Sequence, residues 1–375
     1  MRRAIALARR ALGNTSPNPA VGAVLVRGDK VIGEGWHRRA GMPHAEIEAI
    51  NDAHRRREQI QGATLYVTLE PCCTHGRTPP CTEGILRAGI GRVVIGTLDP
   101  NPAHAGRGPK ILREAGIEVS SGVLDPQAQS LNRGFSHWIV NRTPFVTLKA
   151  AFTLDGKIAT ATGESKWITG LAARNLAGRL RSENDAILVG IKTVLADNPG
   201  LLPPSRARRA LLPPPRLRII LDSQARTPLS AQLLCESPRA ETLVVVGQHA
   251  PYKRVAELQR RVPVWIDPSD NGAIDLNWLM AELGKRPITS LLVEGGGEIH
   301  AAFLAARAAH GVAFFYAPKI LGGSMARRGV AGPGFTDLSS APRLRNWRCR
   351  NVGPDLLVEG DLETLPPKPA STPEA

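Results

Sequence analysis

The strongest constraint on the fold is the alternation of short apolar strand patterns with helical patterns. Residues 63–71 form an apolar run that ends in proline, and residues 81–90 follow with apolar positions at helical spacing. Residues 92–100 are again a strand pattern, and residues 108–119 pass from a helix pattern into another strand. Strands that alternate with short helices are typical of a layered α/β sheet. The chain up to about residue 143 therefore predicts a three-layer α/β domain.

A second set of such patterns begins at Pro144 and predicts a second α/β domain. Strands are expected at residues 145–156, 185–190, 216–222, 242–247, 262–266 and 288–296, and helices at residues 170–184, 276–286 and 298–308. Residues 129–144 are interpreted as the joint, and the Pro- and Arg-rich residues 198–216 as a mobile surface loop. We therefore predict domains at residues 1–143 and 144–365, followed by a disordered tail at residues 366–375.

Composition excludes several classes of protein. No run of eighteen apolar residues occurs, so the sequence predicts no transmembrane helix and no membrane partner. Arg9 and Arg10 interrupt the apolar residues at the start of the chain, which indicates an amphipathic helix and not a signal peptide. Five cysteines, an odd number with three clustered, argue against a disulfide scaffold. We expect a cytoplasmic protein, in which Cys235 and Cys349 are ordinary packed residues.

The net charge of +15 suits an anionic ligand, either nucleic acid or a phosphorylated small molecule. An Arg-rich composition without functional meaning explains the charge equally well, because the arginines are scattered along the chain. Aromatic residues make up only 4% of the chain, and no basic run is interleaved with them. This weakens the case for a surface on which single-stranded nucleic acid stacks.

Three cysteines and a histidine lie within "EPCCTHGRTPPC", residues 70–81. A catalytic zinc site uses three protein ligands and keeps an open position for water. Upstream, "MPHAEIEA" offers His44 and, two residues later, Glu46. An H-x-E motif followed by P-C is the signature of zinc deaminases, in which one His and two Cys hold the metal and the Glu moves protons. Each residue alone is more often a helix cap or a solvated side chain, but the combination favours a metal site.

The spacing leaves open which cysteines bind. No C-x2-C motif occurs, so the choices are Cys72 or Cys73, together with Cys81. Adjacent cysteines in a helical turn point about 100° apart and do not readily reach one ion. Pro43 before His44 and Pro71 before Cys72 both indicate helix starts. A helix N-terminus lowers the pKa of a thiol, which favours the thiolate that a metal needs.

Longer motifs resemble the bifunctional deaminase–reductases of riboflavin biosynthesis. In the first half these are "TSPNPAVGAVLV", "GEGWHRRAGMPHAEIEA", "TLYVTLEPC" and "GRTPPC". The second half contributes "LKAAFTLDGKIATATGESKWITG", "RSENDAILVGIKTVLADNP" and "LLVEGGGEI". The resemblance covers about residues 1–365 in the family's domain order. It implies a cytidine-deaminase-like α/β/α domain followed by a dihydrofolate-reductase-like α/β domain.

For the first domain the resemblance implies zinc ligands at His44, Cys72 and Cys81, with Glu46 as the catalytic proton shuttle and Cys73 as a bystander. Asn18 and His37 match substrate-binding positions that line the pyrimidine pocket. His75 and Arg77, in the loop between the ligand cysteines, are candidates to meet the substrate phosphate. One residue departs from the family: Thr74 stands where a His is common.

For the second domain the resemblance implies an NADPH site. By itself, "VEGGGEI" between a strand and a helix is a weak signal for a phosphate cradle, and a tight turn explains it equally well. The matching cofactor positions are Ala151, Trp167, Thr193, Asp197, Gly295, Gly296 and Gly297. The matching substrate positions are Ser165, Arg181, Leu201 and Glu294. Lys149 and Asp155 fall beside the site, where Asp155 before Gly156 also suits a simple turn.

A second departure concerns the family's phosphate-binding Arg, because Pro204 occupies that position. Arg206, Arg208 or Arg209 are the nearby substitutes. The predicted activity is zinc-dependent deamination of a diaminopyrimidinone ribosylamino 5′-phosphate, then NADPH-dependent reduction of its ribosyl group to ribityl. The alternatives are a deaminase whose second domain only binds, and a nucleic-acid base deaminase. We expect a phosphorylated pyrimidine as the partner, no nucleic acid, and a homo-oligomer of unspecified size.

Overall fold

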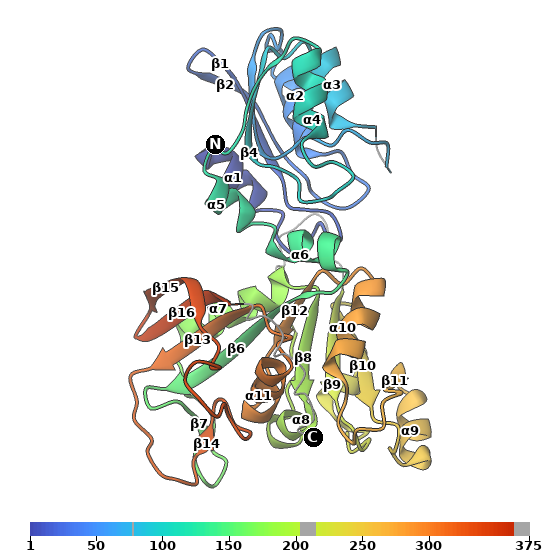
Figure 1. The fold of residues 1–375 in the computed structure, drawn as a ribbon, viewed down its shortest axis with the longest axis vertical. Coiled ribbons are helices and arrows are strands. Elements are labelled where there is room, and N and C mark those ends of the chain that lie inside the picture. The colour runs from blue at the N-terminus through green and yellow to red at the C-terminus, as the bar shows by residue number, and fades with distance from the viewer. Residues whose placement is uncertain (77–78, 203–214, 364–375) are drawn as a thin grey trace, which may run out of the picture. The chain divides into compact units, whose positions relative to one another are not determined.

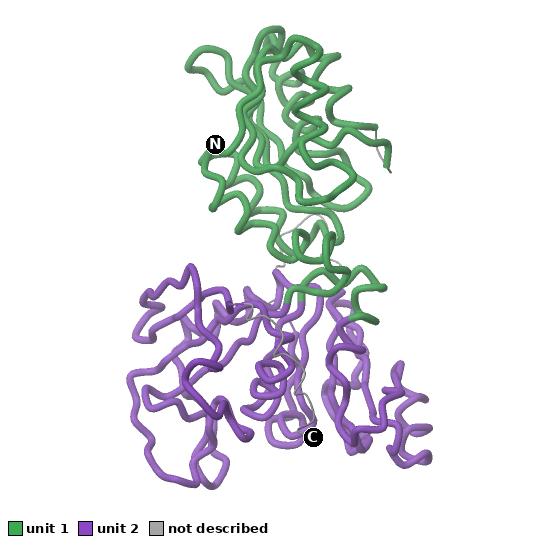
Figure 2. Tube along the Cα trace, in the orientation of Figure 1, with its two compact units in different colours: residues 1–145, 210–214, 281–290 green, residues 146–209, 215–280, 291–375 purple. Residues whose placement is uncertain are grey.

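The computed structural model describes residues 1–76, 79–202 and 215–363. The chain divides into two compact units (Figure 2). Unit 1 contains residues 1–145 and 281–290, and unit 2 contains residues 146–202, 215–280 and 291–363 of the described chain. No helix in these described ranges is long and apolar enough to cross a membrane.

Unit 1 is a five-stranded sheet covered by helices on both faces (Figure 1). Its elements are α1 (Arg2–Ala8), β1 (Gly22–Arg27), β2 (Lys30–Trp36), α2 (Ala45–Arg55), β3 (Thr64–Leu69), α3 (Cys81–Arg87), β4 (Arg92–Thr97), α4 (Arg107–Glu114), β5 (Glu118–Ser120), α5 (Asp125–Gln129) and α6 (Arg133–Asn141). The strand order is β2-β1-β3-β4-β5. β1 is antiparallel to β2 and β3, whereas β3, β4 and β5 are parallel.

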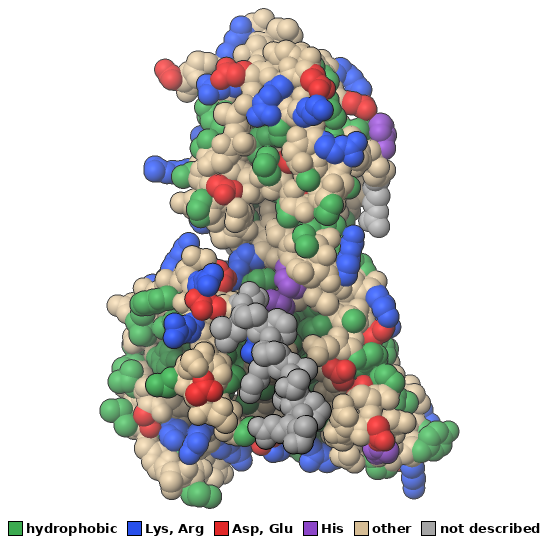
Figure 3. Space-filling model, in the orientation of Figure 1, with side chains coloured by type: hydrophobic (Ala, Val, Ile, Leu, Met, Phe, Trp, Pro, Cys, Tyr) green, Lys and Arg blue, Asp and Glu red, His purple; other side chains and the backbone are tan. Residues whose placement is uncertain are grey.

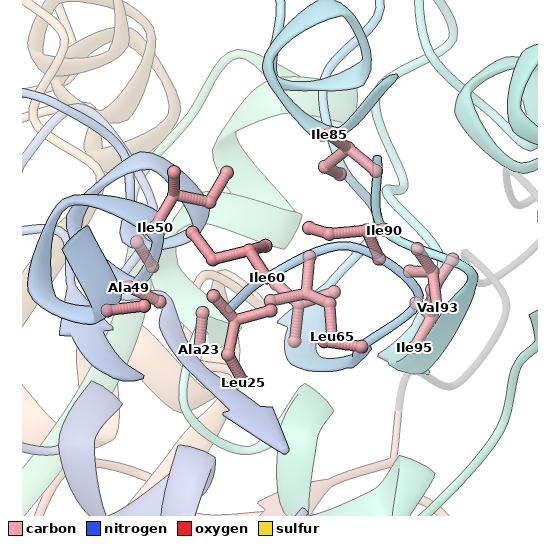
Figure 4. Close-up of a cluster of buried hydrophobic side chains, with 14 of the residues drawn as sticks. Ala23, Leu25, Ala49, Ile50, Ile60, Leu65, Ile85, Ile90, Val93 and Ile95 are labelled. Carbon is pink, nitrogen blue, oxygen red and sulfur yellow. The ribbon is translucent and has the colours of Figure 1, made fainter. Parts of the chain in front are cut away.

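Alternation along β1 assigns its side chains to two apolar layers. Ala23 and Leu25 belong to the core beneath α2 and α3, which Figure 4 shows in close-up. Val24, between them, packs on Ala4 and Leu7 of α1 across the sheet. This period of two is the expected geometry of a strand that is buried on both faces. The predicted three-layer α/β/α arrangement of the first domain is therefore confirmed.

Glycines in β2 let helix α2 approach the sheet closely. A Cβ atom at Gly35 would lie 2.4 Å from both the carbonyl oxygen of Ala45 and the backbone nitrogen of Ala49. At Gly33 it would lie 2.3 Å from the Ala49 carbonyl oxygen. Any larger residue would push the helix away. The start of α2, where His44 lies, is therefore placed by direct backbone contact with the sheet.

Unit 2 is built on a nine-stranded sheet in the order β11-β10-β9-β8-β12-β6-β13-β16-β15. Its elements are β6 (Phe145–Thr153), β7 (Lys157–Ala159), α7 (Leu171–Glu183), β8 (Ala186–Gly190), α8 (Ile191–Asp197), β9 (Arg216–Leu221), η1 (Gln232–Leu234), β10 (Ala240–Val246), α9 (Tyr252–Gln259), β11 (Val264–Ile266), α10 (Leu276–Lys285), β12 (Ser290–Val293), α11 (Gly297–Ala305), β13 (Gly311–Ala317), β14 (Arg327–Arg328), β15 (Leu344–Val352) and β16 (Asp355–Leu362). The unit boundary divides α10 and assigns the first residues of β6 and β12 to unit 1.

The carboxyl ends of β8 and β12 lie side by side, because these two strands are parallel neighbours. The chain leaves β8 through α8 and returns to β9 on the opposite side of β8 from β12. In open α/β sheets, ligands bind at such a point, where the strand order changes direction. The strand order therefore makes the loops after β8 and β12 the expected place for a ligand.

Several helices and strands of the structure were not predicted from the sequence. The predicted joint, residues 129–144, contains helix α6, whose Trp138 Nε1 donates to the Gly284 carbonyl at 2.9 Å within unit 1. The strand β13, the helix α9 and the hairpin of β15 and β16 were not predicted. Arg and Asn residues dominate β15, an edge strand whose stability comes from pairing with β16 and not from burial.

Candidate active sites

His44 occupies the N-cap position of α2, as Pro43 before it predicts. Its backbone is extended, with φ −72° and ψ 166°, and the helix begins at Ala45. Glu46 follows in the first turn, and its side chain faces the interior with 3% of its surface exposed. Because α2 packs directly on β2, both side chains are held on a rigid element.

The two candidate cysteine ligands come from the ends of two neighbouring elements. Cys72 follows β3 after Glu70 and Pro71, and Cys81 is the first residue of α3, with Pro80 as its N-cap. The prediction that Cys72 begins a helix is wrong, because residues 71–76 form an irregular loop and the helix begins nine residues later. The helix end still acts on Cys72, since the backbone N–H of Cys81 donates to its Sγ at 3.3 Å.

The structure brings His44, Cys72 and Cys81 together. Nδ1 of His44 lies 3.2 Å from Sγ of Cys81 and 3.5 Å from Sγ of Cys72. The three ligand atoms all lie within 4.8 Å of one another. Ligand atoms around a tetrahedral zinc ion are about 3.6 Å apart, and zinc favours this combination of nitrogen and sulfur. The three residues therefore fit zinc in both spacing and chemistry.

Cys73 is separate from this triangle. Its Sγ lies 3.6 Å from Nδ1 of His104, on the loop between β4 and α4. This placement agrees with its interpretation as a bystander, although the assignment of ligands remains a prediction. His104 was not singled out in the sequence, because nothing in residues 98–106 marks it as a neighbour of the cysteine loop.

The site perturbs the ionisation of the groups around it. Burial raises the pKa of Glu46 to about 7, and the nearby charge of Cys72 acts in the same direction. A hydrogen bond from Cys81 lowers the pKa of Cys72 to about 4, with help from His44. The same hydrogen bond and burial raise the pKa of the Cys81 thiol. A carboxyl group poised near neutrality beside the Cys72 thiolate is suited to moving protons.

Asn18 and His37 lie next to each other, and His37 lies next to the candidate metal ligand His44. Nδ2 of Asn18 is 3.1 Å from Nε2 of His37, and the ring of His37 stands edge-on to that of His44 with centroids 5.1 Å apart. The pyrimidine pocket that these two residues are predicted to line would therefore lie beside the triangle of His44, Cys72 and Cys81.

Thr74 and His75, in the loop between the two cysteines, are exposed, and His75 lies 3.9 Å from Glu83. Arg77 lies outside the described residues.

In unit 2, Glu294 lies between two cations at the carboxyl end of β12. Arg181 of α7 binds it through two contacts, Nε to Oε1 at 2.6 Å and Nη2 to Oε2 at 2.9 Å. Nζ of Lys149, on β6, donates to Oε2 at 3.2 Å. Burial alone would raise the pKa of Glu294, but the charges of Lys149 and Arg181 lower it to about 2. Glu294 is therefore a fixed carboxylate.

The three glycines after Glu294 form the turn into α11. A Cβ atom would lie 2.5 Å from Ile299 at Gly295 and 2.2 Å from the Arg328 carbonyl at Gly297. At Gly296, the N-cap of α11, the nearest atom would be Oγ1 of Thr193 at 3.8 Å. A side chain would therefore clash at Gly295 and at Gly297 but not at Gly296, which faces Thr193. An open glycine at a helix N-terminus fits the phosphates of a dinucleotide.

The remaining predicted residues come from β6, the segment before α7, and the segment that follows β8. Oγ of Ser165 donates to Asp197 at 3.3 Å, and Trp167, 62% exposed, stacks on Arg174 at 4.3 Å. Ala151 lies in β6 and Leu201 is buried after α8. Among the described residues, no hydrogen bond or ion pair joins the side chains of these two residues to the Glu294 cluster. The sequence reading missed Arg174 and also Lys319, which donates to the Trp167 carbonyl at 2.9 Å.

Asp155 has a structural partner. Its carboxylate accepts the backbone N–H groups of Leu321 and Gly322 at 3.0 and 2.8 Å, and Oγ1 of Thr153 donates to it at 2.7 Å. These bonds hold its pKa below the usual range. The bonds support the turn interpretation of Asp155.

Pro204 occupies the position of the family's phosphate-binding Arg. The candidate substitutes, Arg206, Arg208 and Arg209, lie within residues 203–214, outside the described residues.

Comparison with known proteins matches both halves of the chain. Residues 1–97 match the family model of the cytidine and deoxycytidylate deaminase zinc-binding region, and residues 144–358 match the RibD C-terminal domain. The riboflavin biosynthesis protein RibD of Actinobacillus pleuropneumoniae is 42% identical, over 96% of this chain and 93% of that protein. RibD of Escherichia coli (strain K12) is 41% identical, over 96% and 97%.

Solved structures agree over nearly the full length. One is the Thermotoga maritima protein described as a diaminohydroxyphosphoribosylaminopyrimidine deaminase/5-amino-6-(5-phosphoribosylamino)uracil reductase. It is 38% identical with a TM-score of 0.84, covering 96% of this chain and 97% of that one. Acinetobacter baumannii RibD is 37% identical with a TM-score of 0.82, covering 97% and 98%. The chain therefore belongs to the RibD family of riboflavin biosynthesis proteins, as an enzyme with a zinc-binding deaminase domain and an NADPH-dependent reductase domain.

Proposed function

We propose that the chain catalyses two consecutive steps on one phosphorylated pyrimidine. The first is hydrolytic deamination of 2,5-diamino-6-ribosylamino-4(3H)-pyrimidinone 5′-phosphate, and the second is reduction of the ribosyl group to ribityl. The observation that carries this proposal is the triangle of His44, Cys72 and Cys81 beside a buried Glu46. The printed names of the relatives and the match to the RibD C-terminal domain support the same pair of reactions.

In the first step, His44, Cys72 and Cys81 would hold the zinc ion, which when bound supplies an activated water for hydrolysis. Glu46 takes one proton from the attacking water and delivers it to the ring nitrogen, and it then carries the second proton of that water to the departing amine. Water and the aminopyrimidine thus become a carbonyl and ammonia. The poised pKa of Glu46, about 7, allows it both to accept and to return that proton.

The second step requires a hydride at C1′ of the sugar in its imine form and a proton on the imine nitrogen; NADPH would supply the hydride when bound. Gly295, Gly296, Gly297 and Thr193 are proposed to receive the cofactor phosphates, with Ala151, Trp167 and Asp197 along the cofactor. Ser165, Arg181, Leu201 and Glu294 are the proposed substrate residues. Of the candidate proton donors, Glu294 is held ionised and Asp197 accepts from Ser165, which favours Lys149.

One alternative function is a deaminase whose second domain only binds. A specific observation favours it, because Pro204 stands at the family's phosphate-binding position. Whether Arg206, Arg208 or Arg209 takes over this role is a question for the reductase assay. Bidentate contacts between Arg and phosphate depend on geometry, so a displaced Arg is not automatically equivalent. A working reductase would require one of these arginines or another cation.

A nucleic-acid substrate is less consistent with the surface. On the face shown in Figure 3, Lys and Arg side chains are scattered among acidic and apolar ones and do not form a continuous stripe. Binding to nucleic acid relies on such a stripe.

We further propose domains at residues 1–143 and 144–365 and a homo-oligomer. We also propose a cytoplasmic location, in keeping with five cysteines that form no disulfide. Mass measurement in solution tests the homo-oligomer.

The test is a coupled assay on zinc-loaded protein that follows ammonia release and NADPH oxidation together. We expect both, in a one-to-one ratio. Ammonia without NADPH oxidation would favour the deaminase with a binding domain. If zinc binds and neither signal appears, the substrate assignment is wrong, and single-stranded nucleic acid becomes the next substrate to try.

Cys72→Ser, with Cys235→Ser as its control, tests the metal ligands. Serine replaces a soft thiolate with a poor zinc ligand, so Cys72→Ser should lower the zinc content and reduce ammonia release at least about 100-fold. Cys235 is exposed and remote in sequence from the triangle, so its replacement should change neither quantity. Equal zinc contents in the two variants would contradict the assignment of Cys72.

A further inference from the structure

The segment between β6 and α7, residues 154–170, carries two of the predicted site residues, Ser165 and Trp167. Much of it lies at the surface, because Leu154 is 60% exposed and Trp167 is 62% exposed. Its one regular element in the described structure is the short strand β7. Burial therefore contributes little to its position, so the place of Trp167 depends chiefly on polar contacts.

Asp155 joins the start of this segment to residues 319–322, which follow β13 and which we call the bracket. The Asp155 carboxylate accepts the backbone N–H groups of Leu321 at 3.0 Å and of Gly322 at 2.8 Å. Oγ1 of Thr153 donates to the same carboxylate at 2.7 Å and fixes its rotation. Two successive N–H groups thus converge on one charged acceptor, which links parts of the chain 166 positions apart.

Lys319 extends the link from the bracket to Trp167. The Lys319 carbonyl accepts the N–H of Leu154 at 2.7 Å, and its Nζ donates to the Trp167 carbonyl at 2.9 Å. One residue is therefore bound through its backbone to the start of the segment and through its side chain to Trp167. The Trp167 ring stacks on the guanidinium of Arg174 in α7 at 4.3 Å. Trp167 is thus held at its backbone by Lys319 and at its ring by Arg174.

The middle of the segment is held independently of the bracket. Strand β7 pairs with β14, and the N–H of Gly329 donates to the Gly156 carbonyl at 3.0 Å. Ala159, in β7, is buried. These contacts do not use the side chains of Asp155 and Lys319. Loss of either side chain should therefore leave the pairing of β7 and β14 in place and release the residues after β7.

A local turn accounts for only part of the bonds of Asp155. Asp337 shows such a turn in the same chain, because its carboxylate accepts the hydroxyl of Ser339 and the N–H of Ser340, two and three positions away. Hydrogen bonds hold the pKa of both carboxyl groups below the usual range. The bonds of Asp337 stay within its own turn, whereas those of Asp155 reach the bracket. Asp337 is therefore a matched control.

We propose that Asp155 and Lys319 are positioning residues for the reductase step, and that through the bracket they hold residues 160–168 so that Trp167 stays at the cofactor. Neither side chain needs to touch the cofactor or the sugar, because each acts on the backbone of another segment. The inference rests on the proposed reductase function and adds two residues that determine the geometry of its site. Hydride transfer requires the two carbons in close contact, so looser positioning slows the reaction more than it weakens binding.

Substitutions in the bracket and at Asp155 test this proposal. Asp155→Asn replaces one accepting oxygen by an NH2 group, which cannot accept an N–H. Lys319→Met removes the donor to Trp167, whereas Lys319→Arg keeps a donor. With NADPH and the deaminated ribotide, Asp155→Asn and Lys319→Met should each lower kcat about tenfold and keep the KM for NADPH within about threefold. Lys319→Arg and the control Asp337→Asn should keep kcat within about threefold of the native value.

The double variant shows whether the two residues act through the same bracket. Asp155→Asn combined with Lys319→Met should be only about tenfold slower than the native protein, because the second substitution removes a link that the first has already broken. A double variant slowed by the product of the two single effects, or single variants with a raised KM and an unchanged kcat, would overturn the proposal. Ammonia release at the native rate verifies that unit 1 of each variant is intact.

Hydrogen exchange of the backbone amides tests the positioning without any activity. In Asp155→Asn, residues 160–168 should exchange at least about tenfold faster, while β7 and α7 keep the native rates. Native rates at residues 160–168 would refute the inference. If Asp155→Asn exchanges faster throughout unit 2, Lys319→Met decides the question by the same criterion. Native protein that oxidises no NADPH would instead remove the proposed reductase function, so the two failures are distinguishable.

Discussion

At the scale of single residues, the two sites use buried carboxyl groups in opposite ways. Glu46 has no basic side chain bound to it among the described residues, and burial raises its pKa to about 7. The Glu294 side chain is 6% exposed, but Lys149 and Arg181 lower its pKa to about 2. The environment therefore suits one carboxyl group to carry a proton and makes the other a permanent anion.

The variant Glu294→Gln tests, through the stability of the folded protein, whether Glu294 is a permanent anion. Removing the charge leaves the partly buried Arg181 and Lys149 without compensation, so the free energy of unfolding should fall by about 3 kcal/mol at pH 7. Chemical denaturation measures this change. The control is Glu298→Gln in α11, whose partner Lys192 is 67% exposed, and its effect should stay below about 1 kcal/mol.

The pH dependence of this stability has a definite sign. The pKa of Glu294 is lower in the folded protein than in the unfolded chain, where it is about 4.3. Its contribution is therefore complete above pH 4.3 and is lost as the pH falls towards 2. The difference in unfolding free energy between the native protein and Glu294→Gln should shrink over that window. A difference that stays constant from pH 5 to pH 2 would show that the ion cluster is not its source.

At the scale of elements, each site lies where a strand ends and a helix begins. Helix α2 carries His44 and Glu46, helix α3 begins at Cys81, and helix α11 begins at the glycine turn after β12. The backbone N–H groups at a helix start are unpaired within the helix, so they can bind thiolates and phosphates. The position of α2 depends in turn on Gly35, which permits its contact with β2.

Gly35→Ala should disturb the metal site without touching a ligand. The added methyl group would lie 2.4 Å from backbone atoms of Ala45 and Ala49, so the start of α2 must move. We expect weaker zinc binding, by about tenfold or more, and a matching loss of ammonia release. Competition with a chromogenic chelator measures the affinity. Gly76→Ala is the control, because no atom lies within 4 Å of its added Cβ, and it should retain zinc normally.

At the scale of the whole molecule, the two chemistries depend on different groups in separate units. The candidate zinc ligands belong to unit 1, whereas Glu294 and its two cations belong to unit 2. Each unit contains its own buried apolar clusters. Loss of the metal should therefore leave the reductase activity in place.

Metal removal tests this independence. After treatment with a strong chelator, ammonia release should fall to background, while NADPH oxidation with the already deaminated ribotide should continue at the native rate. Adding zinc should restore ammonia release. A parallel loss of NADPH oxidation would show that the metal also supports unit 2.

Local sequence determined much of this protein by itself. Alternating patterns of strand and helix predicted two α/β domains, and the order of His44, Glu46 and the Pro-Cys motif predicted a metal site before any coordinates. These features are local, because side-chain periodicity, proline and short ligand motifs act within a few residues. The longer motifs then selected a family, and the comparisons confirm it.

Tertiary structure decided what depends on residues far apart in the chain. Spacing alone left Cys72 and Cys73 as alternatives, and the fold placed the first beside His44 and the second beside His104. Arg181 lies 113 positions from Glu294 and Lys149 lies 145, so no local pattern reveals the ion pairs that join them. The same holds for the contact between Asn18 and His37, which are 19 positions apart. Hydrogen bonds and charges act over a few ångströms of space, and only the folded chain determines which groups come that close.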